Sequence, residues 1–215
     1  MKVYPVSSDC TTRLMTVDGI AVRWLQYGSV PSTMDVAVFH AKNGAVPWTV
    51  VSADTQTEGR GTKGSGWFSP GGKGFWVSVI LPVPENLENV SDVTIAAAQA
   101  LAGSLGELTG LQCALKFPND VIVRGKKIAG ILVESQTSGQ RTEFMVLGMG
   151  LNLRETADDF VCAKLPDATS LFIETGTLPD DEKILECFLG HLIRRFYAAP
   201  RADTGSNGES EGGHP

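Results

Sequence analysis

The sequence predicts an α+β fold, with a mixed, largely antiparallel central sheet flanked by helices. The composition is that of an ordinary globular chain, because 42% of the 215 residues are hydrophobic and 20% are charged. Predicted strands follow one another through short turns, which favours antiparallel neighbours. Helical segments interrupt the strands without strict alternation of strand and helix, so a wholly parallel sheet is not expected.

Three helices are predicted from periodicity, composition and capping residues. The first is expected over 33–43, with Ser32 or Thr33 as its N-cap. Residues 92–108 are rich in alanine and apolar on nearly all sides, which is typical of a helix buried in a core. The third is expected over 181–197, where apolar residues recur at helical spacing.

The strands are predicted from runs of β-branched and aromatic residues bounded by turns. They are expected at 20–28, 48–53, 75–81, 112–117, in the two arms of a hairpin at 121–134, and at 142–153. The residues after Pro200 are polar and rich in Gly, Ser and Glu, which predicts disorder. The chain is therefore divided into an N-terminal segment (1–19), one domain (20–198) and a polar tail (199–215).

Positive charge is concentrated in two glycine-containing segments. Residues 59–73 and 116–127 each carry a net charge of +3, although the whole chain carries −6. This distribution favours a focused anion site over a nucleic-acid-binding face, with two solvated loops as the alternative. No apolar run approaches the length of a membrane span, and the N-terminus lacks the apolar core of a secretory signal.

Cysteine and histidine give little support to metal or nucleophilic chemistry. The cysteines are scattered and form no CxxC pair: Cys10, Cys113, Cys162 and Cys187. This pattern argues against a structural zinc site and a disulfide framework, and it favours free thiols in a reducing compartment. The three histidines are isolated from one another, which leaves histidine-based nucleophilic catalysis without support.

The segment GRGTKGSGWFSPGG, residues 59–72, satisfies the spacing G-x-G-x-x-G. A dinucleotide-binding turn is excluded, because Trp67 and then a strand follow where that motif requires a helix. A P-loop is excluded because no G-K-[S/T] ends the run. What remains is either a loop whose backbone amides face an anion, with charge from Arg60 and Lys63, or a plain connection between strands.

Three further motifs carry polar groups that could bind a ligand. In KFPNDVIVRGKKIAGILVE, Pro118 precedes an Asn-Asp pair that could cap a turn or hold a ligand or metal. Lys127 begins a strand that contains Gly130, and a glycine inside a strand often marks the close approach of a ligand. Lys127 is thus a candidate partner for a carboxylate or phosphate, or an ordinary turn lysine. In PSTMD two hydroxyls open a helix, where they either bind a ligand or only cap it, and GMGLN ends a strand.

Together and in this order, these motifs resemble the catalytic domain of biotin protein ligases. The resemblance rests on STMD, QTEGRGTKGSGWFSPGG, KFPND, KKIAGILVE, GMGLN and ATSL, and it covers about residues 20–198. The glycine loop followed by W-x-S-P, combined with P-N-D and K-x-x-G-I-L-V-E, is specific to that family. The related lipoate ligases share the fold but lack these strings.

The resemblance implies an ATP-dependent ligase that makes biotinyl-5′-AMP and pyrophosphate, and then transfers biotin to a lysine of a biotin carboxyl carrier domain. It implies catalytic roles for Arg60 and Lys127. Biotin and its adenylate would be bound by Ser32, Thr33, Gln56, Gly59, Arg60, Gly61, Thr62, Lys63, Gly64, Trp67, Lys127 and Gly130. The nucleotide and metal side would be lined by Lys116, Asn119, Asp120 and Asn152, with Mg²⁺ entering with ATP rather than occupying a fixed protein site.

The sequence departs from the family pattern in three places. Thr62 stands where a second arginine is usual, which removes a charged donor to the adenylate unless Lys63 substitutes for it. Phe117 replaces the usual Trp of the K-W-P-N-D motif. The polar tail stands where most relatives continue into a small β-rich C-terminal domain, and the first 19 residues are too few for the DNA-binding helix-turn-helix of the regulatory subgroup.

These departures set the remaining expectations. We expect a monofunctional cytoplasmic ligase with no repressor role and no nucleic-acid or membrane partner. An exposed sheet edge could support a homodimer. The alternatives are a lipoate or octanoate ligase of the same superfamily and a non-catalytic protein that binds biotin or its adenylate.

Overall fold

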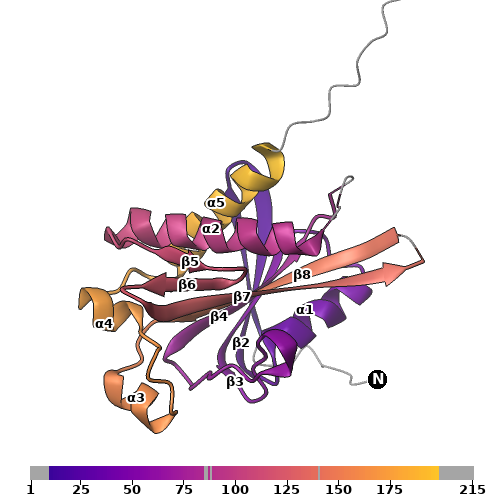
Figure 1. The fold of residues 1–215 in the computed structure, drawn as a ribbon. Coiled ribbons are helices and arrows are strands. Elements are labelled where there is room, and N and C mark those ends of the chain that lie inside the picture. Colours follow the sequence, from indigo (N-terminus) through magenta and orange to yellow (C-terminus); the bar gives the residue numbers. More distant parts are fainter. Residues whose placement is uncertain (1–9, 85–86, 88, 140, 199–215) are drawn as a thin grey trace, which may run out of the picture.

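The computed structural model describes residues 10–84, 87, 89–139 and 141–198, and in this part of the chain an eight-stranded sheet forms the centre of the molecule (Figure 1). The strand order is β1-β2-β3-β4-β8-β7-β6-β5. The strands are β1 (Thr11–Val17), β2 (Ile20–Val30), β3 (Thr49–Gln56), β4 (Gly74–Leu81), β5 (Ala114–Lys116), β6 (Asp120–Val123), β7 (Lys126–Ser138) and β8 (Arg141–Asn152). Strands β2 and β3 pair in parallel and every other neighbouring pair is antiparallel, so the predicted mixed, largely antiparallel sheet is confirmed.

Helices cover both faces of this sheet (Figure 1). They are α1 (Thr33–Lys42), α2 (Val90–Thr109), α3 (Ala157–Cys162), α4 (Leu171–Thr175) and α5 (Asp181–Ala198), with a 3-10 turn, η1 (Thr62–Gly64), in the glycine-rich loop. The three predicted helices correspond to α1, α2 and α5. Every residue of β4 is buried, as expected for a central strand that is covered on both faces.

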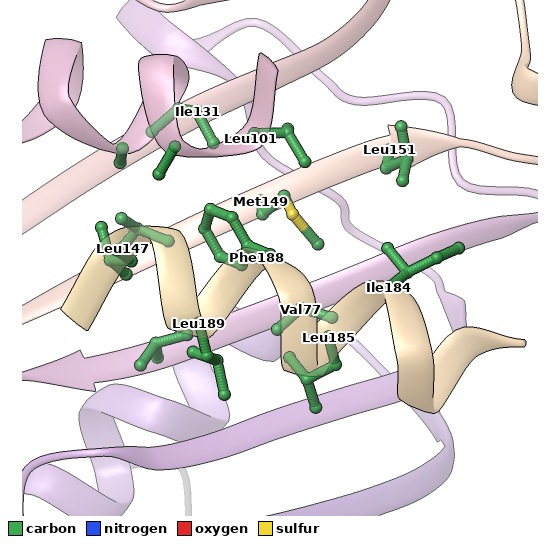
Figure 2. Packing of buried hydrophobic residues seen from close by; sticks show 14 of the residues in the cluster. Val77, Leu101, Ile131, Leu147, Met149, Leu151, Ile184, Leu185, Phe188 and Leu189 are labelled. Carbon is green, nitrogen blue, oxygen red and sulfur yellow. The ribbon is translucent and has the colours of Figure 1, made fainter. Parts of the chain in front are cut away.

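The larger core lies between the sheet and the pair α2 and α5. Figure 2 shows Leu101 of α2 and Phe188 of α5 beside Leu147 and Met149 of β8, and all four belong to one buried cluster. On the opposite face, α1 closes a smaller core that includes Met34. Burial of these side chains stabilises the fold by roughly 1.5–3 kcal/mol each, and the two cores fix the interior strands β7 and β8 that carry site residues.

The sequence analysis predicted no element before residue 20, but β1 extends the sheet there. It forms a hairpin with β2 through Asp18 and Gly19, whose φ angles are 47° and 80°. Two consecutive positive φ values are the geometry of the tight hairpin turn that Asp-Gly favours. The short helices α3 and α4 were also not predicted. The predicted tail at 199–215 lies outside the described residues.

Among the helices that the structure describes, none combines the length and the apolar character needed to cross a bilayer.

Candidate active site

One cavity, with a volume of about 180 Å³, opens between the glycine-rich loop, the start of α1 and strands β7 and β8. Its apolar wall includes Val77, Ile131 and Met149 from the sheet and Phe160 from α3. Eleven of the predicted site residues line it: Ser32, Thr33, Gln56, Arg60, Gly61, Thr62, Trp67, Asn119, Lys127, Gly130 and Asn152. Segments that are far apart in sequence therefore contribute to one site.

A hydrogen-bonded network forms the polar end of the cavity. The backbone N–H and the hydroxyl of Thr33 both donate to Gln56 Oε1, at 2.9 and 3.1 Å. The Ser78 hydroxyl donates to Thr33 Oγ1 at 2.8 Å, and Gln56 Nε2 donates to Ser69 Oγ at 3.1 Å. Ser32 caps α1 through its hydroxyl. The network fixes the orientation of the groups that a polar ligand would meet.

The sequence analysis missed Ser69 and Ser78. Ser78 interrupts the otherwise apolar run FWVSVIL and is completely buried. A lone hydroxyl inside a fully buried strand requires a hydrogen-bond partner, so this signal was present in the sequence, but the partner, Thr33, lies 45 positions away.

Lys127 lies at the start of β7 with its ammonium group beside Asp120. The distance from Nζ to Asp120 Oδ1 is 2.6 Å, and Nζ lies 4.9 Å from the centroid of the Trp67 ring. The backbone of Lys127 is anchored on both sides: its N–H donates to Asp167 O at 2.7 Å, and its carbonyl accepts from Thr169 N at 2.9 Å. Backbone hydrogen bonds therefore fix the position from which the ammonium group reaches the cavity.

Arg60 projects from the glycine-rich loop and pairs with two carboxylates. The guanidinium lies 2.7 Å from Asp35 Oδ1 in the first turn of α1 and 3.5 Å from Glu134 Oε2 of β7. The loop closes on itself through an isolated bridge between Arg60 and Gly66. These ion pairs fasten the loop to the two elements on either side of the cavity. The sequence motifs contained Asp35 and Glu134, but nothing in their spacing linked them to Arg60.

The indole of Trp67 lies against two glycines of the sheet. Gly130 and Gly150 are paired across β7 and β8, and a Cβ atom on them would approach the indole to 2.8 and 2.5 Å. Only glycine leaves room for the ring at these positions. Trp67 Nε1 is buried and has no hydrogen-bond partner among the described residues. The ring thus gives the cavity an apolar surface.

The side chain of Asn152 is committed to the protein, because Nδ2 donates to Thr169 O at 2.9 Å. This bond, with the backbone bonds of Lys127, connects the end of β8, the start of β7 and the ATSL motif. Asn119 accepts from Ile131 N at 2.8 Å through its backbone carbonyl, which leaves its side-chain amide at the cavity. Asn152 therefore joins these segments through Nδ2, and both Asn119 and Asn152 line the cavity.

Four predicted residues do not line the cavity: Gly59, Gly64, Lys116 and Asp120. Asp120 reaches the site through Lys127. Gly59 instead packs against Ser69 of the same loop, and a Cβ atom at Gly59 would come within 2.5 Å of Ser69 Oγ. Gly64 has a φ of 76° at the exposed turn, and Lys116 is exposed on β5. The side chain of Lys63 lies outside the described part of the structure, and the predicted roles of all the site residues stay predictions.

A buried carboxylate, which the sequence analysis also missed, lies just beyond β8. Glu155 is completely buried, and burial raises its pKa to about 6, although nearby backbone amides and Lys73 offset part of this effect. Lys73 itself forms an ion pair with Asp159, and their hydrogen bond is the main cause that lowers the pKa of Asp159 to about 2. Helix α3, which forms part of the cavity wall, is therefore held by the ion pair between Lys73 and Asp159, with the buried Glu155 close by.

The sequence matches a known family over most of the segment that builds the site. The family described as "Biotin/lipoate A/B protein ligase family" matches residues 28–152. The chain is 37% identical over 165 residues to the bifunctional ligase/repressor BirA of Bacillus subtilis, which corresponds to 77% of this chain and 51% of that protein. It is 32% identical over 188 residues to the biotin–[acetyl-CoA-carboxylase] ligase of Mycobacterium tuberculosis, covering 83% of this chain and 66% of the relative.

Solved structures show the same fold. The biotin protein ligase from Aquifex aeolicus in complex with biotin and ATP superposes with a TM-score of 0.69 and 27% identity, covering 81% of this chain and 70% of that one. The biotin protein ligase from Leishmania major in complex with biotinyl-5-AMP gives a TM-score of 0.65 and 26% identity, covering 81% and 74%. The chain spans about half the length, 51%, of the Bacillus relative.

Proposed function

The chain belongs to the biotin/lipoate A/B protein ligase family, and on that premise we propose that it activates biotin with ATP and transfers it to a lysine of a biotin carboxyl carrier domain. The observation that carries the proposal is the convergence of Arg60 and Lys127 on one cavity that also contains a polar network and an indole lying on glycines. Relatives named as biotin–[acetyl-CoA-carboxylase] ligases, and solved ligases in complex with biotin and ATP, support it.

The first step joins two anions, and the two cations offset their repulsion. A carboxylate oxygen of biotin attacks the α-phosphorus of ATP, a new O–P bond forms, and the bond to the bridging oxygen breaks to release pyrophosphate. Lys127 and Arg60 stabilise the charge that accumulates around the α-phosphorus. No protein nucleophile is required, because positioning of the two substrates supplies much of the rate.

The second step consumes the mixed anhydride. The neutral ε-amine of the carrier lysine attacks the acyl carbon, the bond to the AMP oxygen breaks, and the amine proton passes to solvent. Before the carrier arrives, the loop that carries Arg60 and Trp67 would shield the anhydride from water.

Mg²⁺ enters this reaction with ATP and would add positive charge to the phosphates. The side-chain oxygens of Asn119 and Asp120 are ligands of the kind that hard cations prefer. Asp120 already pairs with Lys127, so the metal would share that carboxylate with the lysine.

The polar end of the cavity favours biotin over a linear acyl chain. Thr33 and Gln56 hold hydrogen-bonding groups in fixed positions, and the ureido ring of biotin carries both donors and acceptors. An octanoyl chain has no donor or acceptor that could bond to this network, and a site built around hydrogen bonds to its substrate strongly rejects an analogue that lacks them.

Pyrophosphate release tests the proposal directly. We expect release with ATP, Mg²⁺ and biotin, little release with lipoate or octanoate, and a carrier-domain mass increase that matches one biotinyl group. Release with octanoate in place of biotin would support an acyl ligase of the same family. Biotin binding without pyrophosphate release would indicate a non-catalytic binding protein and contradict the proposal.

The same proposal includes finer assignments. We propose that the protein works in the cytoplasm as a monofunctional enzyme and has no nucleic-acid partner. Strands β1 and β5 form the two edges of the sheet, and a homodimer through one of these edges stays a prediction, which sedimentation analysis of the purified protein would test.

A further inference from the structure

Three potential metal ligands meet where α2 and α5 pack against each other. Glu107 belongs to α2, whereas Cys187 and His191 belong to α5. Their ligand atoms all lie within 4.8 Å of one another, and His191 Nε2 is 2.8 Å from Glu107 Oε2. None of the three lines the cavity described above, so the ligase chemistry leaves this cluster without a role.

The two helices place these side chains for a packing reason that is visible at Gly103. Cys187 and His191 are four residues apart on α5 and therefore project from the same face of the helix. The imidazole lies close to α2, because Gly103 has no side chain: a Cβ atom there would come within 3.0 Å of His191 Nδ1. The thiol of Cys187 lies 3.9 Å from the carbonyl oxygen of Ser104. The close approach leaves Nε2 directed toward Glu107.

We propose that Glu107, Cys187 and His191 form a binding site for a zinc ion, with water as the fourth ligand. Thiolate, imidazole and carboxylate are the ligand types that zinc takes in proteins, at distances of about 2.0–2.3 Å. A tetrahedral ion at those distances places its ligand atoms about 3.3–3.7 Å apart. Small side-chain rotations would bring the three ligand atoms to this spacing, because they already lie within 4.8 Å of one another and the Glu107 side chain is 63% exposed.

The electrostatic environment supports a cation at this position. The Glu107 carboxylate supplies negative charge beside the Cys187 thiol and the His191 imidazole. Zinc displaces the thiol proton to solvent as the S–Zn bond forms. Arg194 lies nearby but is paired with Asp18 at 2.7 Å, and Lys183 and Glu186 line the adjoining surface pocket.

This proposal revises the expectation that the cysteines hold no metal. The pattern Cys187-x-x-x-His191 provides only two ligands within one helix, which is a weak signal. The third ligand lies 84 positions before His191 and joins the pair only through helix packing. The competing explanation is that Glu107 and His191 form an ion pair that joins the two helices and nothing more.

Cobalt provides the spectroscopic probe. The reduced, metal-free protein would be titrated anaerobically with Co²⁺, without substrates. We expect one Co²⁺ per chain, the visible bands of tetrahedral cobalt and a thiolate-to-cobalt charge-transfer band in the near ultraviolet, all removed by Zn²⁺. Zinc at a hundredfold excess over its Kd should raise the Tm by about 5 °C or more.

Two variants and one control assign the ligands. Cys187→Ser should abolish the charge-transfer band, and Glu107→Gln should weaken zinc binding at least tenfold. Cys162→Ser, at an exposed thiol on α3, should leave both unchanged. No saturable band, a band that persists in Cys187→Ser, or unaltered affinity in Glu107→Gln would overturn the proposal. Because Glu107 is on the surface, its variant tests the site even if Cys187→Ser folds poorly, and no readout depends on ligase activity.

Discussion

The two cations of the cavity, Lys127 and Arg60, are held in place in opposite ways. Lys127 is anchored by its backbone, because both its N–H and its carbonyl bond to the segment 167–169. Arg60 lies on the glycine-rich loop, and its guanidinium is held by side-chain ion pairs with Asp35 and Glu134. The position of the strand cation therefore survives the loss of its carboxylate partner, whereas the position of the loop cation depends on its partners.

The difference suits the two roles. The side chains of the Arg60 ion pairs are between 25% and 43% exposed, and such partly exposed pairs are typically worth up to about 1 kcal/mol each. A side chain held this weakly can swing away to admit substrates and return. A rigid strand, by contrast, can hold a charge at a fixed distance from the reacting atoms.

Replacement of Lys127 is the largest expected disruption of this arrangement. Because the backbone stays anchored, Lys127→Ala should leave the fold and its Tm nearly unchanged while the rate of biotin adenylation falls about 10²–10³-fold. Steady-state pyrophosphate release measures the effect. Lys126→Ala is the matched control, since that neighbouring lysine is exposed and does not line the cavity. Equal losses in the two variants would show that Lys127 has no special role.

A methyl group at Gly150 tests the contact between the loop and the strands. The Cβ atom of Gly150→Ala would come within 2.5 Å of the Trp67 ring, and relief of such overpacking costs about 1–3 kcal/mol. We expect the indole to move out, and the KM for biotin to rise about tenfold or more. Gly28→Ala is the control, because a Cβ atom there meets nothing within 4 Å. Unchanged KM in Gly150→Ala would mean that the indole does not take part in binding.

Glu155, which lies just after β8, tests how a buried carboxylate affects the stability of the fold near the strands of the site. Burial holds its pKa at about 6 in the folded protein, above its ordinary value of 4.5, so the folded state loses stability as the pH rises from about 4.5 to 6. Glu155→Gln should therefore gain about 2 kcal/mol above pH 6 and nothing below about pH 4.5. Chemical unfolding at pH 7.5 and pH 4.5 compares the free energies of unfolding of the native protein and Glu155→Gln. An equal gain in stability at both pH values would contradict the electrostatic cause.

Removal of the carboxylates that hold the loop gives the smallest expected effect. The double variant Asp35→Asn, Glu134→Gln leaves Arg60 charged but without its two partners. Because exposed ion pairs are weak, we expect the KM for biotin to change only a few-fold, with faster loss of the adenylate to solvent. Asp92→Asn, an acidic residue in the first turn of α2, is the control. Loss of the fold in the double variant would show that these pairs do more than hold the loop.

The sequence predicted the elements whose signals are local. Helices α1, α2 and α5 and the hairpin of β6 and β7 followed from periodicity, caps and turn residues. Strand β1 was missed although Asp18 and Gly19 are a strong hairpin signal, because the residues before them alternate too weakly between apolar and polar. The helices α3 and α4 are too short, at six and five residues, to show a periodic pattern.

The residues of the candidate site also differ in whether a local sequence signal predicts them. Lys127, Arg60 and the glycines were predicted because they stand in recognisable motifs, and the structure brings most of them to one cavity. Their partners could not be predicted, since Glu134 lies 74 positions from Arg60 and meets it only after the sheet has formed. The same holds for Ser78 with Thr33 and for Glu107 with His191, which depend on packing between distant elements.

The most direct test of the central claim is the isolation of the adenylate on the protein. Stoichiometric protein would be mixed with biotin, Mg²⁺ and ATP labelled at the α-phosphate, without carrier, and the bound label would be counted. We predict about one labelled biotinyl-5′-AMP per chain in the native protein and very little in Lys127→Ala. Biotin that binds in both proteins without forming a labelled adenylate in either would contradict the claim that this cavity joins the two anions.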